Sequence, residues 1–193
     1  MSENKVEFGL SKVHYAPYTI TNGKVTFETP IPIPGAVSMT SEPKGELTEF
    51  YADNILYYVA SSNQGYESTL NIATITEQFA IDALGEELDE ADKVLNELAD
   101  AQGKPFALLW QFEGDVKATR HVLFNCKANR PNISGNTKET GTEVSPNELK
   151  LVSSPIEIDG KMMVKTKTTA ATSPSIYDAW YTKVYQKEVS PGS

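Results

Sequence analysis

The chain has 193 residues, of which 39% are hydrophobic and 22% are charged, and its formal net charge at pH 7 is −9. These proportions are typical of a folded globular protein and not of a disordered chain, while the negative charge argues against a protein that binds nucleic acid by neutralising its phosphates. Nine Tyr and seven Phe, together with many Val and Thr, favour pleated strands, so the composition predicts one domain rich in β-structure.

The charge is unevenly divided along the chain. Residues 1–100 contain 5 basic and 17 acidic residues, a net of −12, and residues 101–193 contain 12 basic and 9 acidic residues, a net of +3. One interpretation is that the protein has complementary faces, which favour head-to-tail contacts between copies. The other is that the two halves do not occupy separate faces, because sequence halves rarely do so in a β-fold.

The beginning of the chain and its single cysteine indicate where the protein is made. Residues 1–10 are polar and charged and have no apolar core of a signal peptide, and no segment approaches the ~18 apolar residues of a membrane span. Cys126 is the only cysteine, so it cannot form an internal disulfide. We therefore expect synthesis in a reducing cytoplasm.

Alternation of apolar and polar residues predicts several strands in the first part of the chain. The first includes Val6 and Phe8, and the second follows the hairpin-turn dipeptide Asn22-Gly23. Further strands are expected around 37–41 and 70–72. The segment 31–34, Ile-Pro-Ile-Pro, is expected at an edge or in an extended linker, because proline lacks the donor that a central strand needs.

A short helix is predicted from Thr76 to Leu84, because Thr76 can cap it, apolar residues follow at helical spacing and Gly85 suits its end. The run 86–92 has five acidic residues in seven and is predicted to be a solvated loop. The next segment, with Val94, Leu95 and Leu98, fits a helix or a strand equally well.

A strong hairpin signal lies in the second half. Residues 106–112 are apolar, Gly114-Asp115 is expected to turn the chain, and residues 118–126 return. In the return strand, period-2 alternation places one set of side chains on a shared apolar face: Ala118, Val122, Phe124 and Cys126. Strands are also predicted at 148–152 and 161–168, and a helix that begins at Ser175 and carries Ile176, Trp180 and Val184 at four-residue spacing.

Three segments are predicted to be long loops, namely 41–54, 129–147 and 169–174. The resulting expectation is one domain over residues 1–188, with an N-terminal arm at 1–10 and a flexible loop at 129–147. Residues 189–193 are expected to be a disordered tail or a cloning remnant.

Reactive residues are scarce. His14 and His121 are the only histidines, and neither has the spacing of a catalytic triad or metal site, so each is predicted to lie on a strand surface or satisfied in the core. One cysteine and two histidines cannot supply a zinc cluster, and Cys126 is expected to be a buried structural thiol. Phosphate-binding glycine motifs are missing from the sequence. We therefore expect no enzyme and no catalytic, cofactor-binding or metal site.

Several strings occur in a characteristic order along nearly the whole chain. They are Lys-Val-Glu-Phe-Gly-Leu at 5–10, Val-His-Tyr-Ala at 13–16, Ile-Pro-Gly-Ala-Val at 33–37, Phe-Tyr-Ala-Asp-Asn-Ile-Leu-Tyr-Tyr at 50–58, Phe-Ala-Leu-Leu at 106–109, Glu-Gly-Asp at 113–115, Phe-Asn-Cys at 124–126, Asn-Arg-Pro at 129–131 and Tyr-Asp-Ala-Trp-Tyr at 177–181. No single string is specific, but their ordered combination resembles the major tail (tail tube) proteins of long-tailed, non-contractile bacteriophages of Gram-positive hosts.

This resemblance implies a mainly β fold, in which two antiparallel sheets pack as a sandwich or barrel with one flanking α-helix and long loops. It also implies that six subunits close a ring and that rings stack into a virion tail tube, through which DNA passes on ejection without specific binding. The implied partners are other copies of the chain and the tape measure, tail-tip and tail-terminator proteins, with no cofactor and no membrane.

By the same resemblance, the segment through Glu49, Tyr51, Asp53 and Asn54 is the candidate self-assembly site, in contact with the adjacent ring. The alternative is that the neighbouring Phe50, Tyr51 and Ile55 return to the core of their own subunit.

Other functional classes stay open at this stage. The chain could be a receptor- or carbohydrate-binding β-sandwich of a phage tail tip, which would expose Trp and Tyr in a cleft. However, Trp110 and Trp180 are predicted to be packing residues. A jelly-roll enzyme is disfavoured by the scarcity of His and Cys, and the tube subunit of a secretion machine is a related possibility.

Overall fold

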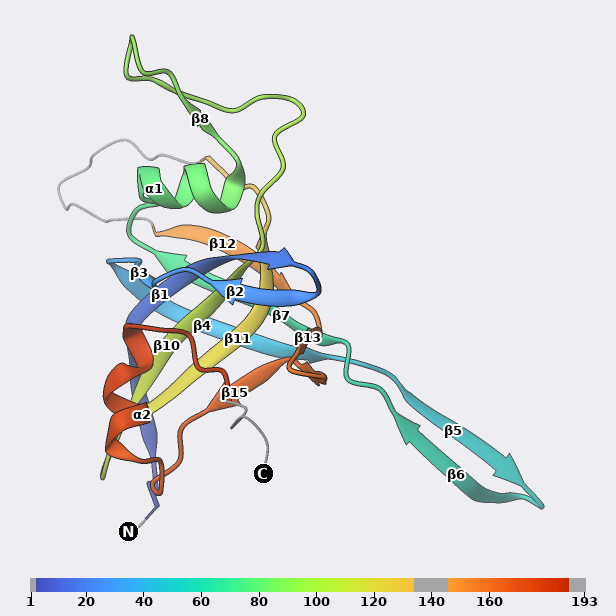
Figure 1. Cartoon of the computed structure of the whole chain (residues 1–193). Helices are drawn as coiled ribbons and strands as arrows, with labels where there is room; N and C mark the ends of the chain where they lie inside the picture. Colours follow the sequence, from blue (N-terminus) through green and yellow to red (C-terminus); the bar gives the residue numbers. More distant parts are fainter. Residues whose placement is uncertain (1–2, 134–145, 188–193) are drawn as a thin grey trace, which may run out of the picture.

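The computed structural model describes residues 3–133 and 146–187 and shows a mainly β, antiparallel architecture (Figure 1). The main sheet has the strand order β2-β1-β10-β11-β12-β7-β4. Its strands are β1 (Glu7–Thr21), β2 (Lys24–Phe27), β4 (Ala36–Lys44), β7 (Gly65–Ile72), β10 (Phe106–Gly114), β11 (Thr119–Ala128) and β12 (Asn147–Ser153). Two short strands pair outside this order: β3 (Ile31–Pro32) with β1, and β15 (Lys165–Lys167) with β11.

The sheet bends sharply between β11 and β12, which pair over only three residues, Cys126 to Ala128. The β12-β7-β4 half therefore packs against the β1-β10-β11 half as a sandwich, confirming the predicted mainly β fold, and the described strands do not close into a barrel. Between the halves lies the first core, to which both contribute: Val13, Tyr15, Phe106, Leu108, Trp110, Leu123 and Cys126 from one half, and Leu70, Ile72, Leu149 and Leu151 from the other.

The predicted helix over 76–84 is confirmed. Helix α1 (Glu77–Phe79) continues as a wider π-helical turn, η1 (Ala80–Leu84). The Thr76 hydroxyl accepts a hydrogen bond from the Phe79 amide at 3.3 Å, and Gly85 ends the helix with φ 81°. The helix lies beyond β12 (Figure 1) and buries Phe79, Ala83 and Leu84 in the first core.

The opposite face of β1-β10-β11 carries a second core. Its sheet residues include Tyr18, Leu109, Val122 and Phe124. They are covered by the hairpin β13 (Ile156–Ile158)–β14 (Lys161–Met163) and by the C-terminal segment, in which helix α2 (Pro174–Asp178) continues as a 3₁₀ turn, η2 (Ala179–Tyr181). Trp180, which was predicted to be a packing residue, and Val184 are buried there. The helix predicted to carry Ile176, Trp180 and Val184 is present but ends at Tyr181, so Val184 lies beyond it, and it is a second helix beside the one that the resemblance implied.

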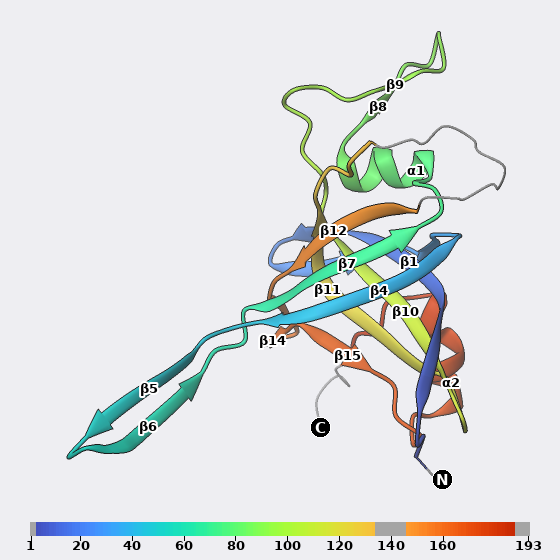
Figure 2. The same ribbon diagram turned by 180° about the vertical axis from the view of Figure 1, so that it is seen from behind.

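Two hairpins extend away from the sandwich (Figures 1 and 2). The first is formed by β5 (Leu47–Ala52) and β6 (Ile55–Ser61), and the second by β8 (Glu87–Leu88) and β9 (Leu95–Asn96). The predicted loop over 41–54 is therefore wrong, because this segment continues β4 and becomes one side of the first hairpin. The acidic run is exposed as predicted but includes strand β8, and Leu95 lies in a strand and not in a helix.

Two further expectations need correction. Cys126 does not share a face with Phe124: Asn125 has φ 49° and forms a bulge in β11, where Phe106 pairs with Cys126 and Leu108 with Leu123. The extra residue turns Cys126 to the face of Leu123.

The N-terminal arm predicted for 1–10 is strand β1 from Glu7 onward. The loop predicted for 129–147 lies largely outside the described residues, as does the tail at 189–193. No helix of the described residues is long and apolar enough to cross a membrane.

Candidate assembly surface

The β5–β6 hairpin, residues 45–61, is called the arm below, and it prolongs β4 and β7 beyond the sheet. At its base the Gln64 amide donates to the Lys44 carbonyl at 2.9 Å, and the Ser62 amide donates to the Glu46 carbonyl at 3.0 Å. A β-carbon at Gly45 would lie 2.0 Å from the Ser62 carbonyl oxygen, so glycine is what allows the two chains to approach here. In both views the arm points away from the sandwich (Figures 1 and 2).

The arm exposes large apolar side chains along its whole length. Eight of them are between 44% and 70% exposed: Leu47, Phe50, Tyr51, Ile55, Leu56, Tyr57, Tyr58 and Val59. None of these residues belongs to either core. An isolated two-stranded hairpin is at best marginally stable in water, and monomeric proteins rarely expose contiguous apolar surface of this extent. The arm is therefore a candidate interface that the described residues of its own chain leave uncovered.

Both faces of the arm are apolar. Phe50 lies opposite Tyr58 on one face, and Tyr51 lies opposite Leu56 on the other. The register shift between these pairs makes Tyr57 an extra residue in β6, and its ring packs edge-on against Phe50 at 6.5 Å between centroids. A partner can therefore contact the arm from either side.

The structure places all four predicted site residues on the distal part of this arm. The Tyr51 hydroxyl donates to Glu49 Oε2 at 2.8 Å, and this hydrogen bond raises the pKa of Tyr51. Asp53 and Asn54 form the turn, with φ values of 52° and 64°. Their left-handed backbone is that of a tight hairpin turn, so both residues have a structural reason to be there.

The alternative that the aromatic residues beside this turn return to their own core is wrong. Phe50, Tyr51 and Ile55 are 57%, 60% and 61% exposed. They lie on a hairpin that projects into solvent (Figure 2).

Comparisons with known proteins leave the family open. No protein-family model matches the chain, and no curated protein matches its sequence. Two solved structures are similar to it. The first is a chain of the anti-feeding prophage cap, the tube-terminating cap, with a TM-score of 0.48 and 10% identity over 88% of this chain and 97% of that one. The second is a chain of the anti-feeding prophage baseplate, with a TM-score of 0.48 and 11% identity over 89% of this chain and all of that one. At these TM-scores the likeness assigns neither a family nor a function.

Sequence reasoning missed most of the surface. It selected the residues around the turn but not Leu56 to Val59, which supply much of the apolar area. A usable signal was present, because the Asp53-Asn54 dipeptide is flanked on both sides by aromatic and aliphatic residues, as in a hairpin. The aromatic side chains instead suggested burial.

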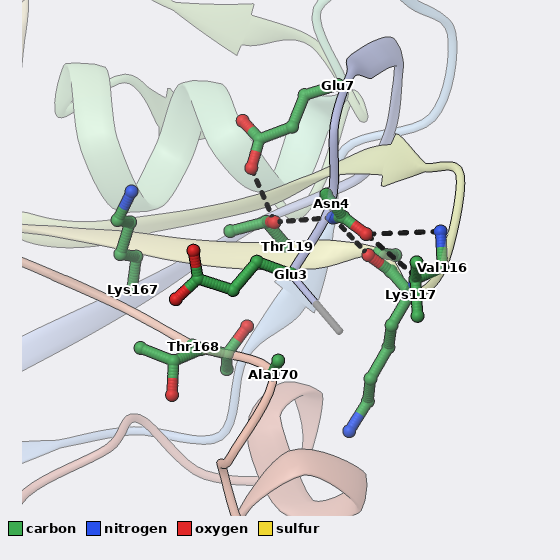
Figure 3. Close-up of a pocket in the computed structure, with 11 residues that line it drawn as sticks. Glu3, Asn4, Glu7, Val116, Lys117, Thr119, Lys167, Thr168 and Ala170 are labelled. Atoms are coloured by element: carbon green, nitrogen blue, oxygen red, sulfur yellow. Dashed lines mark hydrogen bonds between the residues drawn. The ribbon is translucent and has the colours of Figure 1, made fainter. Parts of the chain in front are cut away.

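Apart from the arm, the surface has a hollow of about 330 Å³ between the N-terminal residues, the β10–β11 turn and the segment after β15 (Figure 3). Several of its polar groups are bonded to one another. Asn4 Nδ2 donates to the Lys117 carbonyl at 2.6 Å, the Val116 amide donates to Asn4 Oδ1 at 3.1 Å, and the Thr119 hydroxyl donates to Glu7 Oε1 at 2.6 Å. These hydrogen bonds hold the N-terminal residues against the β10–β11 turn. Among the described residues that line the hollow, no nucleophilic side chain is hydrogen-bonded to a histidine.

The two predicted core groups with titratable chemistry are buried. His121 is 8% exposed and stacks on Trp110, with 5.1 Å between the ring centroids. Cys126 is fully buried, and burial raises the pKa of its thiol to about 12. His14 lies on β1, where its Nδ1 is 2.9 Å from the Lys12 carbonyl oxygen. The described residues contain no group of three or more His, Cys, Asp or Glu side chains that could hold a metal ion.

Proposed function

We propose that this chain is a structural subunit of a phage tail, specifically the major tail protein, whose copies assemble into stacked hexameric rings that form the DNA conduit. The observation that carries the proposal is the arm, a projecting hairpin with eight exposed large apolar residues. The exposed apolar surface would lower the solubility of a subunit that functioned alone, whereas in an assembly a neighbouring subunit covers this surface.

The edges of the sheet support self-assembly as well. β4 is nine residues long and ends the strand order, so one of its edges has no partner among the described strands. Exposed edges of this length invite pairing with another chain, and subunits of a ring can use them to continue a sheet from one copy to the next. The ordered strings of the sequence, which resemble tail tube proteins, select the phage tail among the possible assemblies.

The competing interpretation as a glycan- or receptor-binding module has less support. Trp110 and Trp180 are 4% and 2% exposed, so neither can stack on a sugar. The exposed tyrosines lie on a projecting hairpin and not in a cleft. The arrangement of the remaining polar side chains, bonded to one another or isolated, supports the proposal that the protein is not an enzyme.

The experiment compares the wild type with the variant Phe50→Ser/Tyr58→Ser. Concentrated wild-type protein, imaged in negative stain, is expected to form hollow tubes of uniform width, while the variant is expected to sediment as a monomer. Both substitutions are at exposed positions, so the melting temperature should stay within about 2 °C, which corresponds to a few tenths of a kcal/mol.

Ile20→Ser is the matched control, because Ile20 is 60% exposed on β1 and lies off the arm. It should leave the tubes intact. Tubes formed equally well by the arm variant would contradict the role of the arm. Wild-type protein that stays monomeric at every concentration would contradict the proposed function itself.

A further inference from the structure

We propose that the arm of one copy docks into a groove beside the C-terminal helix of another copy, head to tail. The inference rests on the proposed function and adds the surface that receives the arm. This C-terminal groove is a hollow of about 560 Å³ along α2, η2 and the residues that follow. Its lining includes Ile176, Ala179, Trp180 and Tyr185, together with Lys183 and Lys187.

The groove offers the apolar, aromatic surface that the arm needs. Its accessible apolar side chains are Ile176, which is 39% exposed, and the half-buried Tyr185. The Tyr185 ring stacks on the buried Trp180, with the ring centroids 5.8 Å apart and the planes 12° from parallel. Aromatic side chains that enter such a pocket commonly supply most of the binding energy of an interface. Phe50 and Tyr58, which are 57% and 61% exposed and pair across the arm, are the expected anchors.

The charges of the two surfaces are opposite. Residues 45–61 contain three acidic residues, Glu46, Glu49 and Asp53, and no basic residue. The described residues that line the groove include Lys187 and no acidic residue. Such complementarity selects the correct partner and orients it as the two surfaces approach. The acidic β8–β9 hairpin exposes fewer large apolar side chains than the arm does, so the arm fits the groove better than that hairpin does.

The positions of the two surfaces favour a second copy as the occupant. In both views the arm leaves one flank of the sandwich, and α2 lies on the opposite flank (Figures 1 and 2). The arm of a copy therefore points away from its own groove and toward the space that a neighbour would occupy. A contact between two different surfaces of identical copies repeats from one copy to the next, and it closes into a ring when the rotation allows.

The test mixes two variants that each add one cysteine, Tyr57→Cys on the arm and Ile176→Cys in the groove, and treats the assembled mixture with a short bismaleimide. The native Cys126 is fully buried and stays unmodified in the folded protein. We expect a cross-linked dimer that contains one chain of each variant, at a yield at least tenfold above that of Tyr57→Cys mixed with Val37→Cys. Val37 is 60% exposed on β4 and lies off the groove.

The outcomes separate the inference from the proposed function. Tubes that form normally, with no more cross-linking to position 176 than to position 37, would overturn the docking site and leave arm-dependent assembly standing. Cross-linking within a single chain of a Tyr57→Cys/Ile176→Cys double variant at high dilution would also overturn it, because the arm would then occupy its own groove. A wild type that never assembles would overturn both.

Discussion

Asn54 shows how one residue determines the geometry of the proposed interface. Its φ is 64°, in the left-handed region, which costs a residue other than glycine, asparagine or aspartate roughly 1–2 kcal/mol. Asn54→Val should therefore open the turn, and since the arm packs on neither core, the loss should stay local. We expect faster amide hydrogen exchange throughout residues 47–61 at an unchanged melting temperature. Asn54→Gly, which tolerates this backbone, should exchange like the wild type, and equal exchange in the valine variant would contradict the assigned turn.

His121 links single-residue chemistry to the stability of the whole fold. Burial is the main cause that lowers its pKa to about 4; Glu7 opposes this shift, and Lys167 and Lys165 contribute to it. The unfolded chain takes up this proton near pH 6.5 and the folded chain only near pH 4. The stability that neutral His121 contributes is thus fully present above pH 6.5 and is lost as the pH falls toward 4.

His121→Leu should weaken the dependence of folding stability on pH. The urea midpoint of the wild type should fall between pH 6.5 and 4, and the midpoint of the variant should fall less. The remaining slope belongs to His14, whose pKa burial also lowers, and to carboxylates. Identical slopes for the two proteins would mean that His121 is protonated equally in the folded and unfolded chains. The sequence predicted that His121 lies on a strand surface or is satisfied in the core. In the structure His121 is buried and both of its ring nitrogens lack a hydrogen-bond partner among the described residues, an environment that depends on packing and not on sequence spacing.

At the scale of single elements, helix α1 illustrates what local sequence determines. The Thr76 hydroxyl caps the helix through the Phe79 amide, and replacing such a cap with alanine typically costs about 1 kcal/mol. Thr76→Ala should lower the free energy of unfolding by that amount, measured by urea denaturation at constant slope. Thr76→Ser keeps the oxygen and should lose at most a few tenths of a kcal/mol. An alanine variant as stable as the wild type would show that the cap contributes nothing here.

The elements that could be predicted are those whose signals are local. The Asn22-Gly23 turn joins β1 and β2 with φ values of 52° and 77°, and the β10–β11 hairpin follows from two apolar runs around a turn. The bulge at Asn125 was not foreseeable, because it depends on pairing with β10. The arm was mistaken for a loop for a related reason. Its strands pair with each other, but none of its large apolar residues is buried in either core of the described residues, and exposure is a property of the whole fold.

At the scale of the whole molecule, folding and assembly use different residues. Both cores consist entirely of residues outside 45–63, while the largest group of exposed apolar side chains lies inside this range. The four predicted site residues lie there as well. The resemblance selected residues around the turn of the proposed interface, whereas the exposed apolar character of the arm required the structure.

This separation yields a prediction about removal of the arm. The Gln64 amide donates to the Lys44 carbonyl, which is the hydrogen bond that closes a two-residue hairpin turn. Residues 45–63 can therefore be replaced by Asn-Gly, so that β4 turns directly into β7. The shortened chain should keep the wild-type melting temperature in dilute solution or exceed it by a few degrees, because a shorter loop costs less entropy to close.

The same shortened chain should sediment as a monomer at concentrations at which the wild type forms tubes. Each head-to-tail contact needs one arm and one groove. The shortened chain keeps an intact C-terminal groove but has no arm, so in a mixture it should bind a wild-type arm and prevent the next contact. It should therefore cap the growing assemblies and shorten wild-type tubes in proportion to the amount added. Unchanged tube length in the mixture, with the shortened chain properly folded, would show that the arm is not what joins one copy to the next.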